Sequence, residues 1–145
     1  MKKIFYTLLI YTFFLGKSYA LIEIDITRGN LDPLPIAVSP LHVDVKSDNF
    51  KDIKVKELGN NISNIIEKNF KATGLFNPLK KDAFVQKPDI AHLKPRFEDW
   101  RLIKAQALVT GKLLVKDGKL KVEFRLWDLA AAKEMTALAF TTTPS

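Results

Sequence analysis

The sequence predicts an α/β fold of the α+β kind, in which a mixed sheet of about five strands carries one long and one short helix. Three observations lead to this fold class. An amphipathic helix pattern occupies residues 55–70, extended apolar segments stand on both sides of it, and an Asp-Gly pair separates two further apolar segments. The chain of 145 residues is 47% hydrophobic and 27% charged, which is typical of one globular domain.

The first 20 residues have the features of a signal peptide. Two lysines follow the initial methionine, residues 4–15 form an apolar segment, and small residues stand at Ser18 and Ala20, where a signal peptidase would cut. The apolar segment is shorter than the roughly 20 residues that cross a bilayer. The alternative, a buried amino-terminal helix, conflicts with apolar residues on every face. We therefore expect a signal peptide at 1–20 and the folded domain at 21–145.

Two extended segments come next. Residues 21–27 alternate at strand period, with three isoleucines on one face and a mostly polar set on the other. The pattern predicts a first strand. Pro35–Leu41 reads as a second strand, and its two prolines, which lack amide donors, belong at strand ends or at a sheet edge.

The clearest element is a helix that begins near Val55. Its apolar residues recur mostly at spacings of three and four and share one face: Leu58, Ile62, Ile65, Ile66 and Phe70. Gly74 follows as the expected left-handed stop of the helix. Gly59, inside the helix, costs roughly 1 kcal/mol relative to alanine. We expect that its small size allows another element to pack closely there.

Shorter elements are predicted between this helix and the next strands. Leu75–Leu79 is a third extended segment near a sheet edge. Lys80–Pro95 is charged and interrupted by prolines, so we expect a surface connection. Phe97–Lys104 is predicted as a short helix. Its candidate buried residues are Phe97, Trp100, Leu102 and Ile103.

A β-hairpin is predicted for residues 107–115 and 119–126, because Asp117-Gly118 lies between two apolar segments. In the second segment apolar side chains alternate with charged ones, which gives the strand one apolar face. Trp127 falls on the polar face, so it is a candidate surface contact unless a helix covers it. Met135–Thr141 is the final predicted strand.

Charge and composition exclude several classes of partner. The net charge is +7 at pH 7, and removal of the signal peptide takes away three lysines and no acid, which leaves +4. The basic residues are scattered, so no nucleic-acid partner is expected. With no cysteine the chain has neither disulfides nor a lipid attachment site, and we expect no stable membrane insertion after cleavage. Export without an anchor indicates the periplasm of a double-membraned bacterium, while secretion beyond the cell stays open.

The residues that usually carry catalysis are sparse. The chain has two histidines, His42 and His92, and neither stands at a spacing that metal sites favour. Glu98 and Asp99 are adjacent, so on a helix they diverge rather than share a proton. No serine has the glycine context of a nucleophile, and the six glycines form no phosphate loop. We therefore expect no enzyme, no catalytic residue, no metal and no cofactor.

Four segments together resemble the amino-terminal domain of the TolB family, which belongs to the periplasmic Tol–Pal envelope system. In order they are "IEIDITRGNLDPLPIAVSPL", "ATGLFNPL", "FEDWRLIKAQALVTGKLLV" and "DGKLKVEFRLWDLAAAKEM". They cover nearly all of the chain that follows the predicted signal peptide. The resemblance implies a non-enzymatic binding module that supports outer-membrane integrity and cell division.

The resemblance also implies partners. In the family the extreme mature amino terminus contacts the inner-membrane protein TolA, and a β-propeller that follows the domain binds the lipoprotein Pal. The matching positions for a TolA-like partner are Leu21, Ile22, Glu23, Ile24, Asp25 and Ile26. Strand addition to a sheet edge of the partner is the expected mode of binding, because the isoleucines alternate while the backbone supplies hydrogen bonds. The same segment could instead pair in its own sheet.

The sequence departs from the family pattern after the last strand. Family members continue into a helix and then the propeller, whereas this sequence ends at "FTTTPS". Binding of Pal is therefore not expected of this chain, and we expect the helix that closes the family domain at its carboxyl end to be missing. We predict an exposed apolar patch on one sheet face. Two alternatives stay open: the product of a split or degenerate gene without independent function, and an unrecognised exported enzyme.

Overall fold

The computed structural model describes residues 32–44, 46–47 and 54–143. The described residues form a six-stranded mixed sheet with three α-helices and one short 3-10 turn. The strands are β1 (Leu34–Val38), β2 (His42–Val43), β3 (Phe76–Pro78), β4 (Ala107–Lys116), β5 (Lys119–Asp128) and β6 (Lys133–Thr142). The helices are α2 (Val55–Ala72), α3 (Pro88–Ala91) and α4 (Phe97–Leu102), and the 3-10 turn is η1 (Lys81–Ala83).

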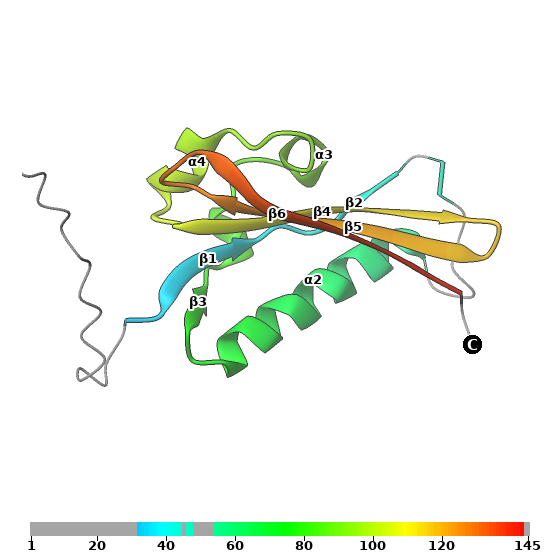
Figure 1. The fold of residues 1–145 in the computed structure, drawn as a ribbon, viewed down its shortest axis with the longest axis horizontal. Coiled ribbons are helices and arrows are strands. Elements are labelled where there is room, and N and C mark those ends of the chain that lie inside the picture. The colour runs from blue at the N-terminus through cyan, green and yellow to red at the C-terminus, as the bar shows by residue number, and fades with distance from the viewer. Residues whose placement is uncertain (1–31, 45, 48–53, 144–145) are drawn as a thin grey trace, which may run out of the picture. The chain divides into compact units, whose positions relative to one another are not determined.

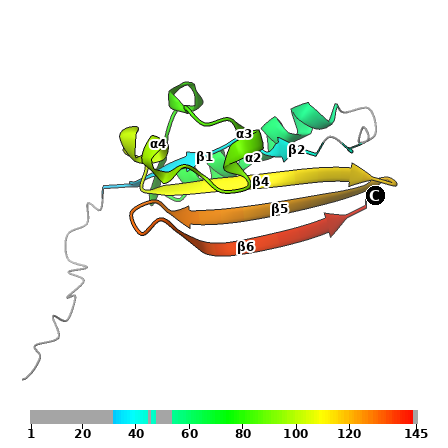
Figure 2. The same ribbon diagram turned by 90° about the horizontal axis from the view of Figure 1, so that it is seen from above.

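The strand order is β3-β1-β4-β5-β6, with β2 paired to the far end of β4. β1 runs parallel to both β3 and β4, whereas β4, β5 and β6 form an antiparallel meander. Helix α2 covers one face of the sheet, and α3 and α4 lie on the other (Figure 1). The view from above shows β4, β5 and β6 side by side, with β6 outermost (Figure 2). The predicted fold class is confirmed, with six strands rather than about five and with α3 as an additional short helix.

Helix α2 confirms the helix predicted from the apolar periodicity, except that Ile65, predicted on its apolar face, is 57% exposed. It spans Val55–Ala72, and Gly74 beyond its end has a φ of +72°, the left-handed conformation that favours glycine. The predicted close approach at Gly59 is also present. A Cβ there would lie 3.1 Å from the carbonyl oxygen of Leu41 and 3.2 Å from Cδ2 of Leu113. The glycine therefore lets the helix sit directly on the strand layer.

The β4–β5 hairpin is confirmed with its turn. Lys116 pairs with Lys119, so the loop contains two residues. Asp117 and Gly118 have φ values of +51° and +69°, the positive pair that a type I′ turn requires. β6 continues the antiparallel order, and a register shift between Leu126 and Trp127 interrupts its pairing with β5.

The segment between β3 and β4 corrects the sequence-based expectation for Lys80–Pro95. It contains η1 and α3, and it buries Gln86, Ala91 and His92 rather than forming a wholly exposed connection. The sequence did not predict that these residues form a layer on the sheet, because the few buried ones do not recur at a helical or strand period.

Helix α4 is present, but the prediction of burial is wrong for one of its four candidate core residues. Trp100 is fully buried, and Phe97 and Ile103 pack at the margin of the same cluster. Leu102, predicted to be buried, is 80% exposed. Two residues along a helix rotate a side chain by about 200°, so Leu102 points away from the sheet when Trp100 points into it.

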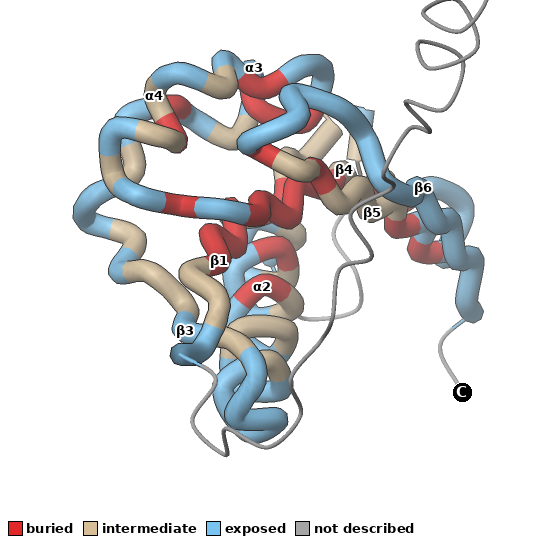
Figure 3. The backbone as a smooth tube through the Cα atoms, turned by 60° about the vertical axis from the view of Figure 1, so that its left-hand side comes forward, coloured by how far each residue is buried: buried red, intermediate tan, exposed pale blue. Residues whose placement is uncertain are grey.

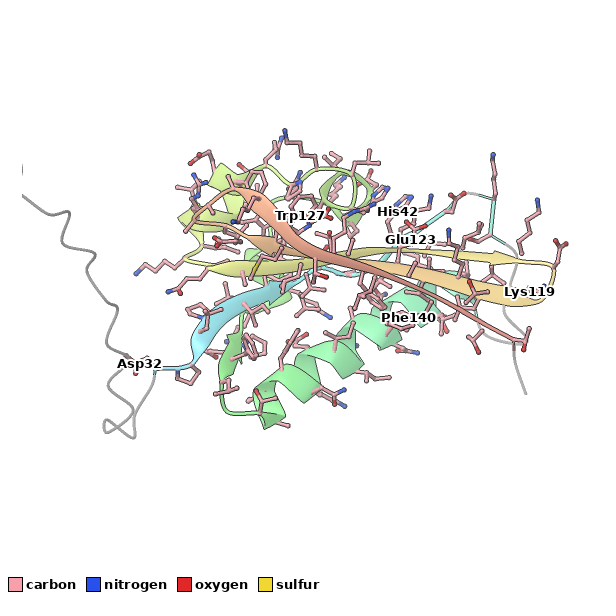
Figure 4. All side chains as sticks on the ribbon, viewed as in Figure 1. Asp32, His42, Lys119, Glu123, Trp127 and Phe140 are labelled. Atoms are coloured by element: carbon pink, nitrogen blue, oxygen red, sulfur yellow. The ribbon has the colours of Figure 1, made fainter. Side chains whose placement is uncertain are left out.

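Trp127 is buried beneath α4, which excludes its role as a surface contact and confirms the alternative that a helix covers it. Its ring meets that of Phe97 edge to face at 5.9 Å between centroids. Its Nε1 donates a hydrogen bond of 2.9 Å to the hydroxyl oxygen of Thr110. Figure 4 shows Trp127 on the side of the sheet that carries α3 and α4, and Phe140 on the side of α2.

Candidate interaction surface

The predicted partner-binding segment, Leu21 to Ile26, lies outside the described residues, as does the predicted signal peptide. Its assignment as a first strand or as a free tail therefore stays a prediction. Among the described residues, no group of three or more histidine and carboxylate side chains could hold a metal ion. None of the helices in the described ranges is long and apolar enough to cross a membrane.

The most conspicuous surface feature is an apolar area on β5 and β6. Cross-strand pairing places Phe124 beside Leu138 and Val122 beside Phe140, all on the face that carries α2. Leu138 is 55% exposed and Phe140 is 56% exposed. Figure 3 shows β6 exposed along its whole length, in contrast to the buried segments of β1 and β4. We call Phe124, Leu126, Leu138 and Phe140, with Ile66 and Phe70 of α2, the open apolar face.

A groove of about 250 Å³ lies within this face, between α2 and β6. Its lining is Ile66, Phe70, Val109, Phe124, Arg125, Leu126, Thr136 and Leu138. Clustered side chains of this kind, open to water on a sheet, are typical of a surface that another chain segment covers. The exposed apolar patch predicted from the sequence is therefore confirmed.

The geometry of α2 explains why the face stays open. A helix with its side chains is about 10 Å wide and strands lie about 4.8 Å apart, so one helix covers about two strands. Val55, Leu58 and Ile62 pack on the cluster around Leu113, and Ile66 and Phe70 pack over the cluster of β1 and β4. The helix therefore leaves β6 exposed along its whole length.

β6 is also an edge strand of the sheet that the described residues form. Its only charged residues are Lys133 and Glu134 at its start, and residues 135–143 carry no charge, no proline and no glycine. Edge strands with these properties pair readily with another strand, because their outward backbone groups lack partners. The opposite edge of the sheet, β3, is three residues long and contains Pro78. The two edges therefore differ strongly in their capacity to accept a strand.

The open apolar face predicts binding of the dye ANS by the folded chain. We expect a double variant, Leu138→Asp with Phe140→Asp, to lose most of the ANS fluorescence, because charged groups replace the exposed apolar surface. Unfolding free energy should change by about 0.5 kcal/mol or less, since both side chains are more than half exposed. Leu102→Asp, at an exposed leucine on another face, is the matched control and should leave the fluorescence unchanged. Equal fluorescence in both variants would contradict the assignment.

The other face of the sheet carries two ion pairs. Lys112 Nζ pairs with Asp44 Oδ2 at 3.1 Å, and Lys121 Nζ with Glu123 Oε1 at 2.9 Å. A hydrogen bond from the backbone amide of Lys46, together with Lys112, lowers the pKa of the Asp44 carboxyl. A hydrogen bond from Lys121 lowers the pKa of Glu123. These ion pairs order the side chains on this face of the sheet.

Sequence reasoning missed one arrangement on this face. His42 and His92, judged separately from the sequence, stack with 4.0 Å between ring centroids and 1° between their planes. Fifty positions separate them in the chain, so no local pattern could have paired them.

Glu98 and Asp99 diverge as predicted, since Glu98 pairs with Arg101 and Asp99 with Arg96, each at 2.6 Å.

Comparison with known proteins identifies the family. The family model of the TolB amino-terminal domain matches residues 22–135. The chain belongs to the TolB amino-terminal domain family. It is 67% identical over 131 residues to the Tol-Pal system protein TolB of Pelagibacter ubique (strain HTCC1062), a match that covers 89% of this chain and 29% of that protein. This TolB-family chain thus spans less than a third of the length of the relative.

Solved structures share the fold of this TolB-family domain. TolB from Acinetobacter baumannii matches with a TM-score of 0.57 and 16% identity, over 77% of this chain and 23% of that one. LpoB from Escherichia coli matches with a TM-score of 0.55 and 6% identity, over 76% and 56%. At such identities the likeness shows the fold alone. The same arrangement of sheet and helices therefore occurs in both of these proteins.

Proposed function

We propose that the chain is a non-enzymatic binding module of the Tol–Pal system in the periplasm, which contacts a TolA-like inner-membrane protein through Leu21 to Ile26. The observation that carries the proposal is the family match, which begins at residue 22 and so includes most of this segment. The 67% identity to a Tol-Pal system protein supports membership of the same system. Binding of Pal is not part of the proposal.

Strand addition is the proposed mode of contact. Ile22, Ile24 and Ile26 alternate along the segment, so an extended conformation presents all three on one side to pockets of the partner sheet. Backbone groups supply hydrogen bonds to the partner edge. Glu23 and Asp25 fall on the other side, where they favour a basic partner and speed association at low salt.

The test measures binding of the purified chain to the carboxy-terminal domain of TolA by calorimetry. Replacement of Ile22, Ile24 and Ile26 by serine should weaken binding at least about 100-fold, because each buried isoleucine contributes about 1.5–3 kcal/mol. Glu23→Gln with Asp25→Asn should weaken binding less and reduce its dependence on salt.

Two controls complete the design. Leu102→Ser removes an exposed leucine from the described domain and should leave the affinity unchanged. Deletion of residues 21–26 should abolish binding as completely as the triple serine variant does. An affinity for TolA that survives the deletion would reject this site.

The open apolar face favours one alternative, in which the chain needs another segment or a second chain to complete its sheet layer. A chain completed in this way would unfold with low cooperativity when alone, since part of its core is exposed to water. Thermal unfolding followed by circular dichroism decides between the two. A sharp, reversible transition favours an independent module, and a broad one favours the alternative.

A further inference from the structure

The stacked histidines join two separate layers of the molecule. His42 belongs to β2 in the sheet, and His92 follows α3 in the layer that covers the sheet. Their rings lie parallel within 1° and 4.0 Å apart. They are also the only histidines of the chain. The stack is therefore a direct contact between the sheet and the segment that contains α3.

The surroundings hold His92 firmly in place. It is 7% exposed, and its Nδ1 lies 3.0 Å from the carbonyl oxygen of Pro88, so this nitrogen is the one that carries a proton. Its backbone carbonyl accepts a hydrogen bond of 3.2 Å from Arg125 of β5. Nearby Ala91 is fully buried. The end of α3 is thus fixed by contacts that converge on one residue.

Charged groups face the stack from each neighbouring element. Asp44 follows His42 beyond β2 and is paired with Lys112 of β4, and Asp89 lies on α3. Arg125 of β5, which bonds the His92 carbonyl, is itself paired with Glu134 of β6. Figure 4 shows His42 near α3, above the strands. Two carboxylates are therefore available to balance one added proton, but Lys112 and Arg125 oppose a second.

We propose that the His42–His92 stack is an acid-sensitive latch. It holds residues 86–92, which we call the α3 segment, on the sheet when at most one ring is charged, and it releases this segment when both rings are protonated. Two parallel imidazoles at 4.0 Å stack favourably when neutral, and also when one is a cation. Two cations at that distance repel one another strongly, because partial burial weakens screening by water and salt.

Burial lowers the pKa of His42 from its ordinary value of 6.5, and the neighbouring His92 lowers it further. Its folded form therefore binds fewer protons than its unfolded form. The stability that depends on neutral His42 is fully present above pH 6.5 and decreases as the pH falls below that value. The latch accordingly opens on the acid side and closes on the neutral side.

The first test follows both imidazoles by NMR while the pH is lowered. Because the chain has no other histidine, each signal belongs to one member of the pair. We expect two protonation steps separated by about one pH unit or more, as for strongly interacting groups. In His42→Phe, which keeps a ring in the stack, one protonation step should remain instead of two.

The second test uses tryptophan fluorescence as the readout of opening. Trp100 and Trp127 both lie on the face that carries the α3 segment, and Trp100 donates a hydrogen bond to Gln86 within that segment. Fluorescence should change with the second protonation step, and in His42→Phe this change should be absent, because two cations can no longer face one another in the stack. If His42→Phe does not fold, His42→Gln serves the same purpose, because it also cannot titrate.

Two results would overturn the proposal. One is a pair of histidines that titrate independently, with His92 unaffected by replacement of His42. The other is a fluorescence profile that has the same acid midpoint in the natural chain and in His42→Phe, which would show that the stack is only a packing contact. Leu93→Gln, at an exposed residue beside His92, controls for unspecific loosening and should leave both profiles unchanged.

Discussion

Replacing Trp100 by alanine should lower the free energy of unfolding by about 3–5 kcal/mol, the usual cost of removing a large aromatic side chain from a core. Trp100 is 1% exposed and sits at the centre of the cluster that joins α4 to the sheet. Its ring meets Phe84 edge to face at 5.0 Å, and its Nε1 donates a 2.9 Å hydrogen bond to Gln86. Urea denaturation at pH 7 measures the loss.

Two further variants separate packing from hydrogen bonding at this site. Trp100→Phe keeps most of the aromatic surface but removes the donor to Gln86, whose Oε1 still accepts from the backbone amide of Arg96. It should cost clearly less than the alanine variant. Leu102→Ala, on the same helix but exposed, should change stability by about 0.5 kcal/mol or less. Comparable losses in Leu102→Ala and Trp100→Ala would refute the assigned core.

Gly111→Ala should destabilise the domain by about 1–3 kcal/mol through overpacking. A Cβ at this position in β4 would lie 2.7 Å from the backbone carbonyl oxygen of Glu123 and 3.1 Å from Leu41. The oxygen belongs to the adjacent strand and cannot move without disturbing the β4–β5 ladder. Thermal unfolding, with backbone amide chemical shifts of β4 and β5, reports both the energy and the distortion.

The matched control adds methyl groups to a strand where space exists. Ala139→Val on exposed β6 should be neutral or slightly stabilising, because valine favours strands. Gly59→Ala provides a graded comparison, since its Cβ would meet the nearest atom at 3.1 Å and alanine improves helix propensity. The loss should therefore be smaller than at Gly111. An unchanged melting temperature in Gly111→Ala would show that the sheet adapts more easily than the distances imply.

Elements whose cause is local were predictable from the sequence. Helix α2 follows from apolar spacing and a glycine stop, and the hairpin follows from Asp117-Gly118, where both residues must adopt positive φ. Leu102 and α3 were mispredicted because burial there depends on which side of a very short helix meets the sheet. Short helices offer too few residues for a periodic signal.

The candidate sites also divide into those with a local cause in the sequence and those that depend on the tertiary fold. The open apolar face could be anticipated, because alternation along 119–126 predicted an apolar strand face and the family resemblance implied a missing cover. The His42–His92 stack could not be anticipated, since it depends on the tertiary path that carries α3 across β2. The proposed TolA segment lies outside the described residues, so its assignment depends on the sequence and the family match.

The strand order has a consequence for how the chain reaches its fold. β4, β5 and β6 are joined by short turns, so they can pair early at little entropic cost. β1 pairs in parallel with β4, and its partners, such as Ala107 for Ile36, lie roughly 70 positions later in the chain. Closing so long a loop is slow. We therefore expect β1, together with β3 that pairs only with it among the described strands, to join the meander last. The part of the sheet nearest residues 21–26 in the chain is then among the last to form.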